Sequence, residues 1–196
     1  EKMKGVLKVV NLDTGVGVIA ESYWQAKKAI AAIKVTYSST GTERVDTASI
    51  MTQFRTDMDK AVEQGDEQED VSLGNARKVI ASADKVIEAE YSVPYLAHIT
   101  MEPMNSTALV EDGKVEIWLG TQNPLGIKHA VADALDIDDV DVSINNTFLG
   151  GGFGRRAMDD YPIQAAKLAR ALPGVPVKMI WSREEDVQHD FYRPAV

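Results

Sequence analysis

The first 37 residues alternate between short apolar runs and polar turns. Two apolar runs, residues 6–10 and 16–20, flank the turn-forming residues 11–15, and this arrangement predicts a β-hairpin. Residues 23–33 then repeat apolar side chains at the spacing of an amphipathic helix. Residues 35–37 return to the β-branched and aromatic composition of a strand. We therefore expect a small unit of two strands, a helix and a third strand.

Residues 38–71 have a different character and are predicted to be a linker. Residues 48–61 show a weak helical pattern, and residues 63–70 form an acidic run without apolar side chains. We interpret that run as a solvated surface, because it has nothing to bury. Residues 72–82 predict a short helix. Residues 85–94 alternate polar and apolar side chains, as a strand with one solvent-facing side does.

The pattern of the C-terminal half is the most regular in the chain. Asp112 and Gly113 separate two alternating runs, residues 107–111 and 114–119, and such a pair is the strongest short hairpin signal. Four more elements are predicted in order: a helix over residues 124–135, a strand over 138–148, a helix over 159–172 and a strand over 177–181. Ser182 is expected to cap a last helical turn. The fold class predicted from these elements is α+β.

Composition narrows the range of functions. The chain has 196 residues, of which 44% are hydrophobic and 26% charged, as in an ordinary globular protein. Its net charge of −9 argues against a nucleic-acid partner. The absence of cysteine excludes disulfides and iron–sulfur ligands within this chain. No apolar run approaches the ~20 residues of a membrane span. Because the chain begins at Glu1 without a signal peptide, we expect it to be a segment of a larger protein.

Residues 147–156 carry the most distinctive motif, with the sequence TFLGGGFGRR. Four glycines in five positions remove the Cβ atoms that keep a ligand from the backbone, and they permit positive φ angles. Consecutive N–H groups can then converge on one anionic or polar partner. Arg155 and Arg156 follow directly, and guanidinium groups suit phosphate. Between a predicted strand and a predicted helix, the motif indicates a loop that holds a phosphorylated cofactor.

The spacing excludes the two commonest glycine-rich motifs. Counted from Gly150, the sixth position of a dinucleotide fingerprint is Arg155, and counted from Gly152 it is Ala157. A nucleotide P-loop fails as well, because Gly154 is followed by two arginines instead of lysine and serine or threonine. A tight turn with exposed arginines stays open as the simpler interpretation.

Other catalytic patterns are weak. His98 and Glu102 lie four residues apart, near Glu90, but Pro103 disfavours a helix there, and the other two histidines are distant in sequence. We therefore expect no metal bound directly by side chains of this chain. No Gly-x-Ser-x-Gly elbow supports a hydrolase.

Four ordered motifs resemble one known family. They are HITMEPMN at residues 98–105, GTQNP at 120–124, LGGGFGRR at 149–156 and WSREED at 181–186. Together they resemble the molybdopterin-binding large subunits of the xanthine dehydrogenase and aldehyde oxidase family. The branch most similar to this chain is that of the isoquinoline 1-oxidoreductase beta subunits, also called membrane-bound aldehyde dehydrogenases.

The resemblance implies a domain organisation. Residues 1–37 would be the end of a hammerhead-like α/β unit that precedes the cofactor domain in this family. Residues 38–71 would be a linker or acidic surface segment, and residues 72–196 the first part of the molybdopterin-binding α+β domain. The chain is thus expected to be a fragment of a catalytic subunit.

The resemblance also implies which residues meet the cofactor. They are Gly151, Gly152, Phe153, Gly154, Arg155 and Gln122. Glu102 is expected to hold the loop by hydrogen bonds instead of acting as a base. The catalytic glutamate of the family would lie beyond Val196, so no catalytic residue is assigned here. Many xanthine dehydrogenases have a glutamine where this chain has Leu96, and a Gly-Lys-Glu run where it has Arg-Arg-Ala at residues 155–157. The missing glutamate argues against a purine substrate.

The implied activity is that of a molybdenum hydroxylase, which oxidises an aldehyde or an N-heteroaromatic compound with water as the oxygen source. The implied cofactor is molybdenum–molybdopterin, in its cytosine dinucleotide form, and the isolated fragment is expected to lack it and to be inactive. The resemblance further implies an iron–sulfur small subunit and an electron acceptor such as a cytochrome. It also implies a location at the bacterial periplasm or its membrane face. The alternative from another class is a non-catalytic phosphate- or nucleotide-binding module that uses the same loop.

Overall fold

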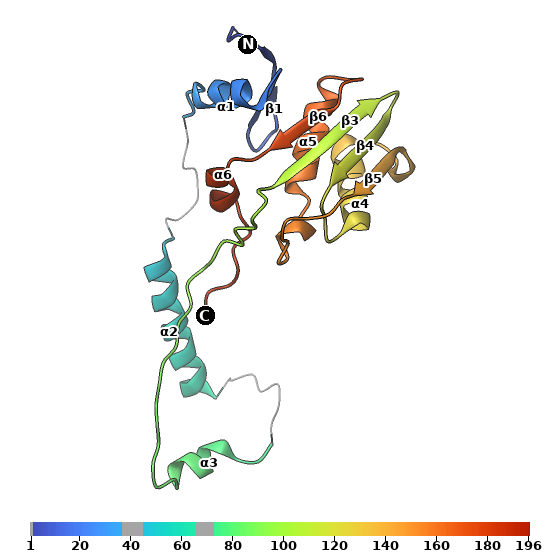
Figure 1. The fold of residues 1–196 in the computed structure, drawn as a ribbon. Coiled ribbons are helices and arrows are strands. Elements are labelled where there is room, and N and C mark those ends of the chain that lie inside the picture. Colours follow the sequence, from blue (N-terminus) through green and yellow to red (C-terminus); the bar gives the residue numbers. More distant parts are fainter. Residues whose placement is uncertain (1, 37–44, 66–72) are drawn as a thin grey trace. The chain divides into compact units, whose positions relative to one another are not determined.

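The computed structural model describes residues 2–36, 45–65 and 73–196 (Figure 1). Within these ranges, no helix is both long and apolar enough to cross a membrane. The chain divides into two compact units: Glu1–Tyr37 with Ala97–Phe191, and Ser38–Leu96 with Tyr192–Val196. The domain boundaries predicted at residues 37 and 71 stay predictions.

The first unit begins with the predicted hairpin. Strand β1 (Val6–Asn11) pairs antiparallel with β2 (Val16–Ala20), and helix α1 (Tyr23–Ala31) follows. Both predictions are confirmed. The strand predicted for residues 35–37 is wrong, because its described part lies in no strand and the hairpin forms a sheet of two strands only. Residue 37 itself lies outside the described residues.

A four-stranded sheet forms the centre of the first unit (Figure 1). The order is β5-β4-β3-β6, made of β3 (Asn105–Glu111), β4 (Lys114–Leu119), β5 (Val142–Asn146) and β6 (Val177–Ile180). Strand β3 pairs antiparallel with both β4 and β6, whereas β4 and β5 are parallel. The four strands predicted between residues 107 and 181 are therefore present.

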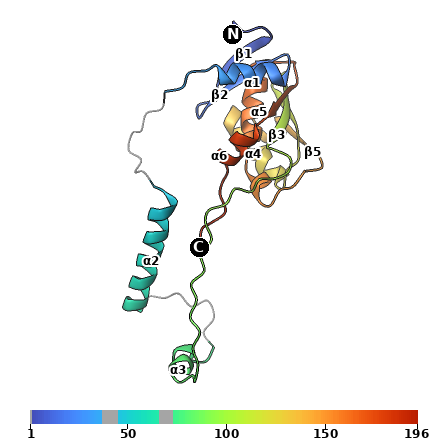
Figure 2. The same ribbon diagram turned by 60° about the vertical axis from the view of Figure 1, so that its left-hand side comes forward.

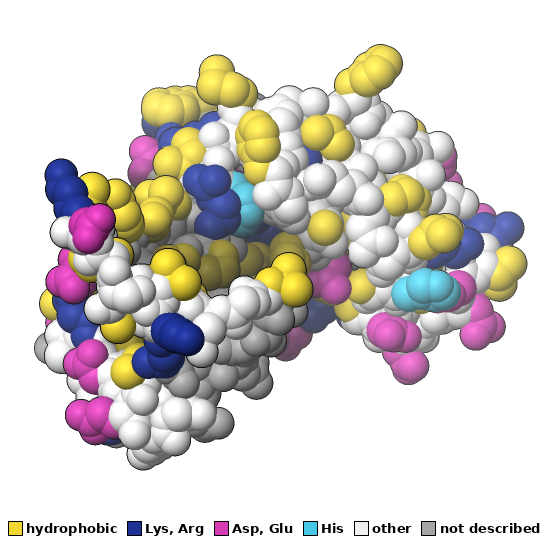
Figure 3. All heavy atoms as spheres, turned by 90° about the horizontal axis from the view of Figure 1, so that it is seen from below, with side chains coloured by type: hydrophobic (Ala, Val, Ile, Leu, Met, Phe, Trp, Pro, Cys, Tyr) yellow, Lys and Arg dark blue, Asp and Glu magenta, His cyan; other side chains and the backbone are white. Residues whose placement is uncertain are grey.

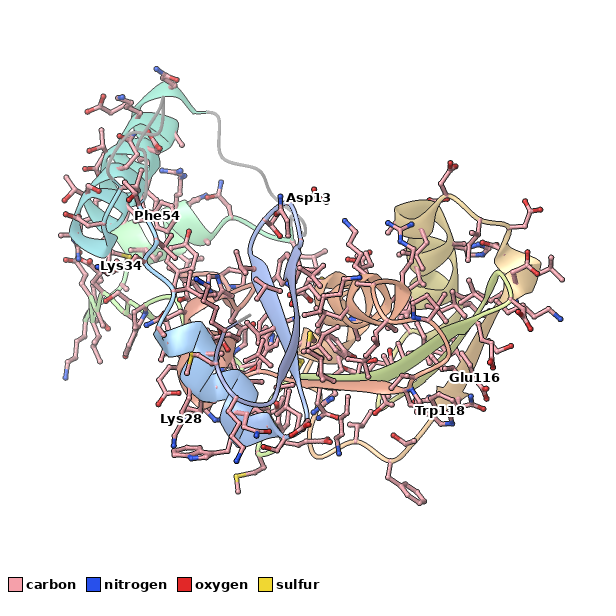
Figure 4. All side chains as sticks on the ribbon, turned by 90° about the horizontal axis from the view of Figure 1, so that it is seen from above. Asp13, Lys28, Lys34, Phe54, Glu116 and Trp118 are labelled. Atoms are coloured by element: carbon pink, nitrogen blue, oxygen red, sulfur yellow. The ribbon has the colours of Figure 1, made fainter. Side chains whose placement is uncertain are left out.

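The turn between β3 and β4 fixes the register of this sheet. Asp112 and Gly113 have φ angles of 50° and 77°, as the two central residues of a type I′ turn require. Because side chains alternate along a strand, one face of β4 is buried and consists of Val115, Ile117 and Leu119. Glu116 and Trp118 lie on the other face (Figure 4), where Glu116 accepts a hydrogen bond from Asn145 (2.9 Å).

Two amphipathic helices cover the buried face of the sheet (Figures 1 and 2). Helix α4 (Pro124–Leu135) packs against β5, and helix α5 (Asp160–Arg170) packs against β3 and β6. Both helices confirm the sequence predictions. The core between helices and sheet includes Ile117, Ile127, Val131, Tyr161 and Ala165, all inaccessible to solvent. A final helix, α6 (Arg183–Gln188), begins with the predicted Ser182 cap.

The second unit contains α2 (Thr47–Gln64) and α3 (Ala76–Ala81). Helix α2 is longer than its weak pattern predicted, and it ends at Gly65 in the left-handed conformation (φ 65°). The strand predicted for residues 85–94 is wrong, because that segment forms no strand and is exposed. Val93 exchanges two backbone hydrogen bonds with Val196, but no ladder extends from this pair. Most of the acidic run, residues 66–70, lies outside the described residues.

Candidate functional site

The glycine-rich loop joins β5 to α5, as the sequence predicted. A short 3-10 helix, Arg155–Ala157, intervenes between the loop and α5. The loop contains three positive φ angles: 98° at Gly151, 54° at Phe153 and 101° at Gly154. Glycine adopts such angles at no steric cost, but Phe153 does not, and strained backbone of this kind concentrates at functional sites.

The backbone N–H groups of this loop fall into two classes. Gly150 N–H donates to Glu102 Oε2 (2.8 Å), and Gly154 N–H donates to Gln122 Oε1 (3.0 Å). Between them, the N–H groups of residues 151–153 have no hydrogen-bond partner among the described residues. Three consecutive N–H groups without a partner form a concavity suited to an anion or a polar acceptor.

Glu102 and Arg156 hold the loop from beneath. Arg156 is fully buried, and its guanidinium donates to Gly151 O (2.8 Å), to Glu102 O (2.8 Å) and to Glu102 Oε2 (2.9 Å). Burial alone would raise the pKa of Glu102, but hydrogen bonds from Asn105 and Gly150 and the charge of Arg156 hold it below its ordinary value. The expectation that Glu102 holds the loop by hydrogen bonds is confirmed.

Gln122 lies over the loop from the start of α4. Its Oε1 accepts from Gly154 N–H, so its Nε2 group keeps two donors for another partner. A Cβ added to Gly152 would lie 2.6 Å from Gln122 Oε1, so glycine at this position makes room for the amide. The structure therefore brings Gln122 to the loop, as the resemblance implied.

Arg155 is buried and paired with two carboxylates. Its side chain is 1% exposed, and it donates to both carboxylate oxygens of Asp160 (2.9 and 2.8 Å). Nε lies 3.2 Å from Asp190 Oδ1, and the guanidinium carbon stands 5.4 and 5.3 Å from the rings of Trp181 and Phe191. Burial opposes the charge, but Asp160 and Asp190 outweigh it and raise the pKa of Arg155.

The sequence offered both guanidinium groups as partners for a phosphate, whereas in the structure both already have carboxylate partners. Arg155 and Arg156 are both turned into the protein and paired with carboxylates. This also removes the simpler interpretation of a turn with exposed arginines. A contact between Arg155 and the cofactor stays a prediction.

The segment before Glu102 contacts one residue that sequence reasoning missed. His98 is paired with Asp190, a residue that no sequence motif singled out. Ile99 has a φ angle of 43°, which is a genuine outlier for a β-branched side chain. Thr100, fully buried, donates through Oγ1 to Glu102 O (2.7 Å), and its carbonyl accepts from Arg183 (2.7 Å). The resemblance implied that residues 98–103 form a buried segment facing the cofactor, and in the structure Thr100 is buried but Ile99 and Met101 are exposed. Only its position in space connects Asp190 with this segment.

Apolar side chains next to the loop are exposed. They are Ile99 (56%), Met101 (90%), Phe148 (103%) and Phe153 (72%). The face of the molecule in Figure 3 likewise shows several hydrophobic side chains projecting into solvent. A polar concavity with apolar surroundings is typical of a cofactor or small-molecule site.

The mixed sheet, its two covering helices and a glycine-rich turn with free N–H groups define a cofactor-binding α+β domain. The sequence profile described as the molybdopterin cofactor-binding domain matches residues 28–196, so the chain belongs to that family.

Individual relatives agree with this membership. The chain is 33% identical over 208 residues to the "Membrane-bound aldehyde dehydrogenase [pyrroloquinoline-quinone]" of Gluconacetobacter polyoxogenes. The match covers 100% of this chain and 26% of that protein. It is 29% identical over 202 residues to isoquinoline 1-oxidoreductase subunit beta of Brevundimonas diminuta, again over 100% and 26%. The resemblance stated from the four motifs is thereby confirmed.

The fold agrees with a solved structure. Quinoline 2-oxidoreductase from Pseudomonas putida 86 superposes with a TM-score of 0.66 and 20% identity, over 94% of this chain and 28% of that one. The α+β fold class is thus confirmed. The chain spans about a quarter of the length of the curated relatives it matches.

The residues present fit a pterin cofactor. Such a group carries acceptor oxygens and nitrogens, and the loop offers three free N–H groups at residues 151–153 together with the Nε2 group of Gln122. The cofactor-binding assignment of individual residues stays a prediction. In the described ranges, no cluster of three His, Cys, Asp or Glu side chains could hold a metal ion directly.

Proposed function

We propose that the full-length protein is the catalytic subunit of a molybdenum hydroxylase that oxidises an aldehyde or an N-heteroaromatic compound. The observation that carries the proposal is the run of three unpaired N–H groups at residues 151–153. It occurs in a chain of the molybdopterin-binding family whose relatives are named for aldehyde and isoquinoline oxidation.

The residues of the loop and those that hold it have different tasks in this proposal. The N–H groups of Gly151, Gly152 and Phe153 bind acceptor atoms of the cofactor, and Nε2 of Gln122 adds a donor. Glu102 and Arg156 keep the loop in its strained shape before the cofactor arrives, so little ordering remains to be done on binding. The cofactor, when bound, supplies the two-electron oxidation with oxygen taken from water.

Finer proposals rest on the resemblance. They are the cytosine dinucleotide form of the cofactor, an iron–sulfur partner subunit, a cytochrome as electron acceptor and a location at the periplasmic face of a bacterial membrane. The names of two relatives as subunits support a partner protein in general. Purification of the full-length protein with its partners, after cell fractionation, tests all of these at once.

One relative is named for a different cofactor, pyrroloquinoline quinone. The decisive experiment therefore measures three quantities in the purified full-length protein: molybdenum, pterin and the quinone. We expect molybdenum and pterin in equal amounts, close to one per chain, and substrate-dependent reduction of an acceptor dye. If the protein contained the quinone and no molybdenum, the cofactor would be pyrroloquinoline quinone instead of molybdopterin. Active material without either would overturn the proposal, and bound nucleotide without oxidase activity would favour the non-catalytic module.

A further inference from the structure

His98 lies beside the glycine loop and is fixed there by Asp190. The backbone N–H of His98 donates to Asp190 Oδ2, and ring Nδ1 lies 2.9 Å from Asp190 Oδ1. The two side chains are 9% and 2% exposed, respectively. Arg155 Nε lies 3.2 Å from the same Oδ1 atom. Asp190 thus holds both the backbone and the ring of His98 in one orientation.

This environment selects one tautomer of the ring. A carboxylate that faces the permanent cation of Arg155 acts as an acceptor, so Nδ1 of His98 carries the proton. In the neutral ring, Nε2 then keeps a free lone pair. No hydrogen bond reaches Nε2 from the described residues, and the atom lies 3.8 Å from the place where a Cβ on Gly154 would stand. His98 therefore presents an unused acceptor at the loop.

The loop also presents free donors. They are the N–H groups of residues 151–153 and the Nε2 group of Gln122. A ligand that satisfies the loop and His98 together must carry acceptor atoms on one edge and an N–H or O–H donor on another. A pterin ring has both kinds of group.

We propose that His98 is a ligand-binding residue of this site, which accepts a hydrogen bond through Nε2 from an N–H or O–H group of the bound cofactor. Asp190 is its positioning residue. The inference rests on the proposed function. The role it assigns to His98 requires no metal ion bound to protein side chains. A buried aspartate that orients a histidine ring is a common way to fix the atom a histidine offers to its partner.

Two substitutions separate the structural task of His98 from its ligand-binding task. In His98→Asn the amide N–H replaces Nδ1–H and can still donate to Asp190, but nothing stands at the position of Nε2. In His98→Gln the longer side chain carries its amide to the position of Nε2 and can offer an acceptor there. His129→Asn is the matched control, because His129 Nδ1 is also paired with an aspartate, Asp139, but its side chain is 66% exposed on α4.

The test uses the full-length protein expressed in a host that makes the cofactor. Molybdenum and pterin per chain are measured together with the thermal unfolding midpoint. We expect His98→Asn to retain about a tenth of the parent's cofactor, as the loss of one buried hydrogen bond predicts. His98→Gln should retain about half or more, and His129→Asn should equal the parent.

Different failures are distinguishable. If the parent is loaded and His98→Asn is loaded equally, this inference is overturned while the proposed function stands. If His98→Asn does not fold, His98→Gln decides, since an empty but folded His98→Gln protein overturns the inference and a loaded one supports it. A parent without molybdenum and pterin overturns the proposed function and this inference with it.

Discussion

Gln122 Oε1 lies 2.6 Å from the position that a Cβ on Gly152 would occupy, and the same oxygen accepts the N–H of Gly154. The φ angle of Gly152 lies outside the left-handed region, so other residues could adopt its backbone conformation. Glycine is needed here because the side chain of Gln122 occupies the space of a Cβ. The two positions therefore form one structural unit.

Gly152→Ala should displace the amide of Gln122 and break its hydrogen bond to Gly154. Gln122→Ala removes the same bond, and each single variant should lose about 1 kcal/mol of stability and part of its cofactor. The double variant should lose little more than either single one, because only one interaction is shared. Denaturant midpoints and molybdenum content of the full-length protein measure this. Additive losses would show that Gly152 acts independently of Gln122.

Glu102→Gln should weaken the loop in a pH-dependent way. The pKa of Glu102 is lowered in the folded protein from its ordinary value of 4.5. Its charge therefore contributes stability that is fully present above pH 4.5 and is lost as the pH falls through the lower, folded pKa. The difference in unfolding free energy between parent and Glu102→Gln should accordingly be constant near neutral pH and narrow below pH 4.5. A difference that grows on acidification would contradict the role given to the carboxylate.

Arg155→Met should be among the most destabilising substitutions in this region. It leaves Asp160 and Asp190 without their shared cation, and breaking a buried ion pair on one side costs about 3–5 kcal/mol. Arg55→Ala is the control, because the Arg55–Glu90 pair is exposed (53% and 66%) and should cost less than about 1 kcal/mol. Thermal unfolding of both variants gives the comparison. Equal losses would mean that Arg155 is paired no better than a surface arginine.

Gly120→Ala should lower stability by disturbing the packing of Gly120 against Leu149, just before the glycine-rich loop. The added Cβ would stand 2.7 Å from Leu149 Cβ and 3.0 Å from Leu149 Cα, so backbone must move, at a cost of about 1–3 kcal/mol. Gly15→Ala is the matched control, since nothing lies within 4 Å of its added Cβ. Circular-dichroism melting curves of the two variants should differ accordingly. A Gly120→Ala protein as stable as Gly15→Ala would refute the close packing described.

The sequence alone determined the features that depend on neighbouring residues. The Asp112-Gly113 turn, the helices over residues 124–135 and 159–172, and the position of the glycine-rich turn all follow from local backbone preference and from apolar spacing. The strand predicted for residues 85–94 failed for the complementary reason. Alternation describes a strand's two faces but supplies no partner, and the one backbone pair that this segment forms within the described residues, between Val93 and Val196, is too little to form a strand.

Only the tertiary structure decided how the site is assembled. Two arginines beside glycines suggested an open phosphate site. In the structure, however, Arg156 forms an ion pair beneath the loop with Glu102, which lies 54 residues away in sequence. His98 meets Asp190 across 92 residues. Such pairs leave no periodic trace in the sequence, because the free energy of burying a charge or orienting a ring depends on which groups the fold brings together.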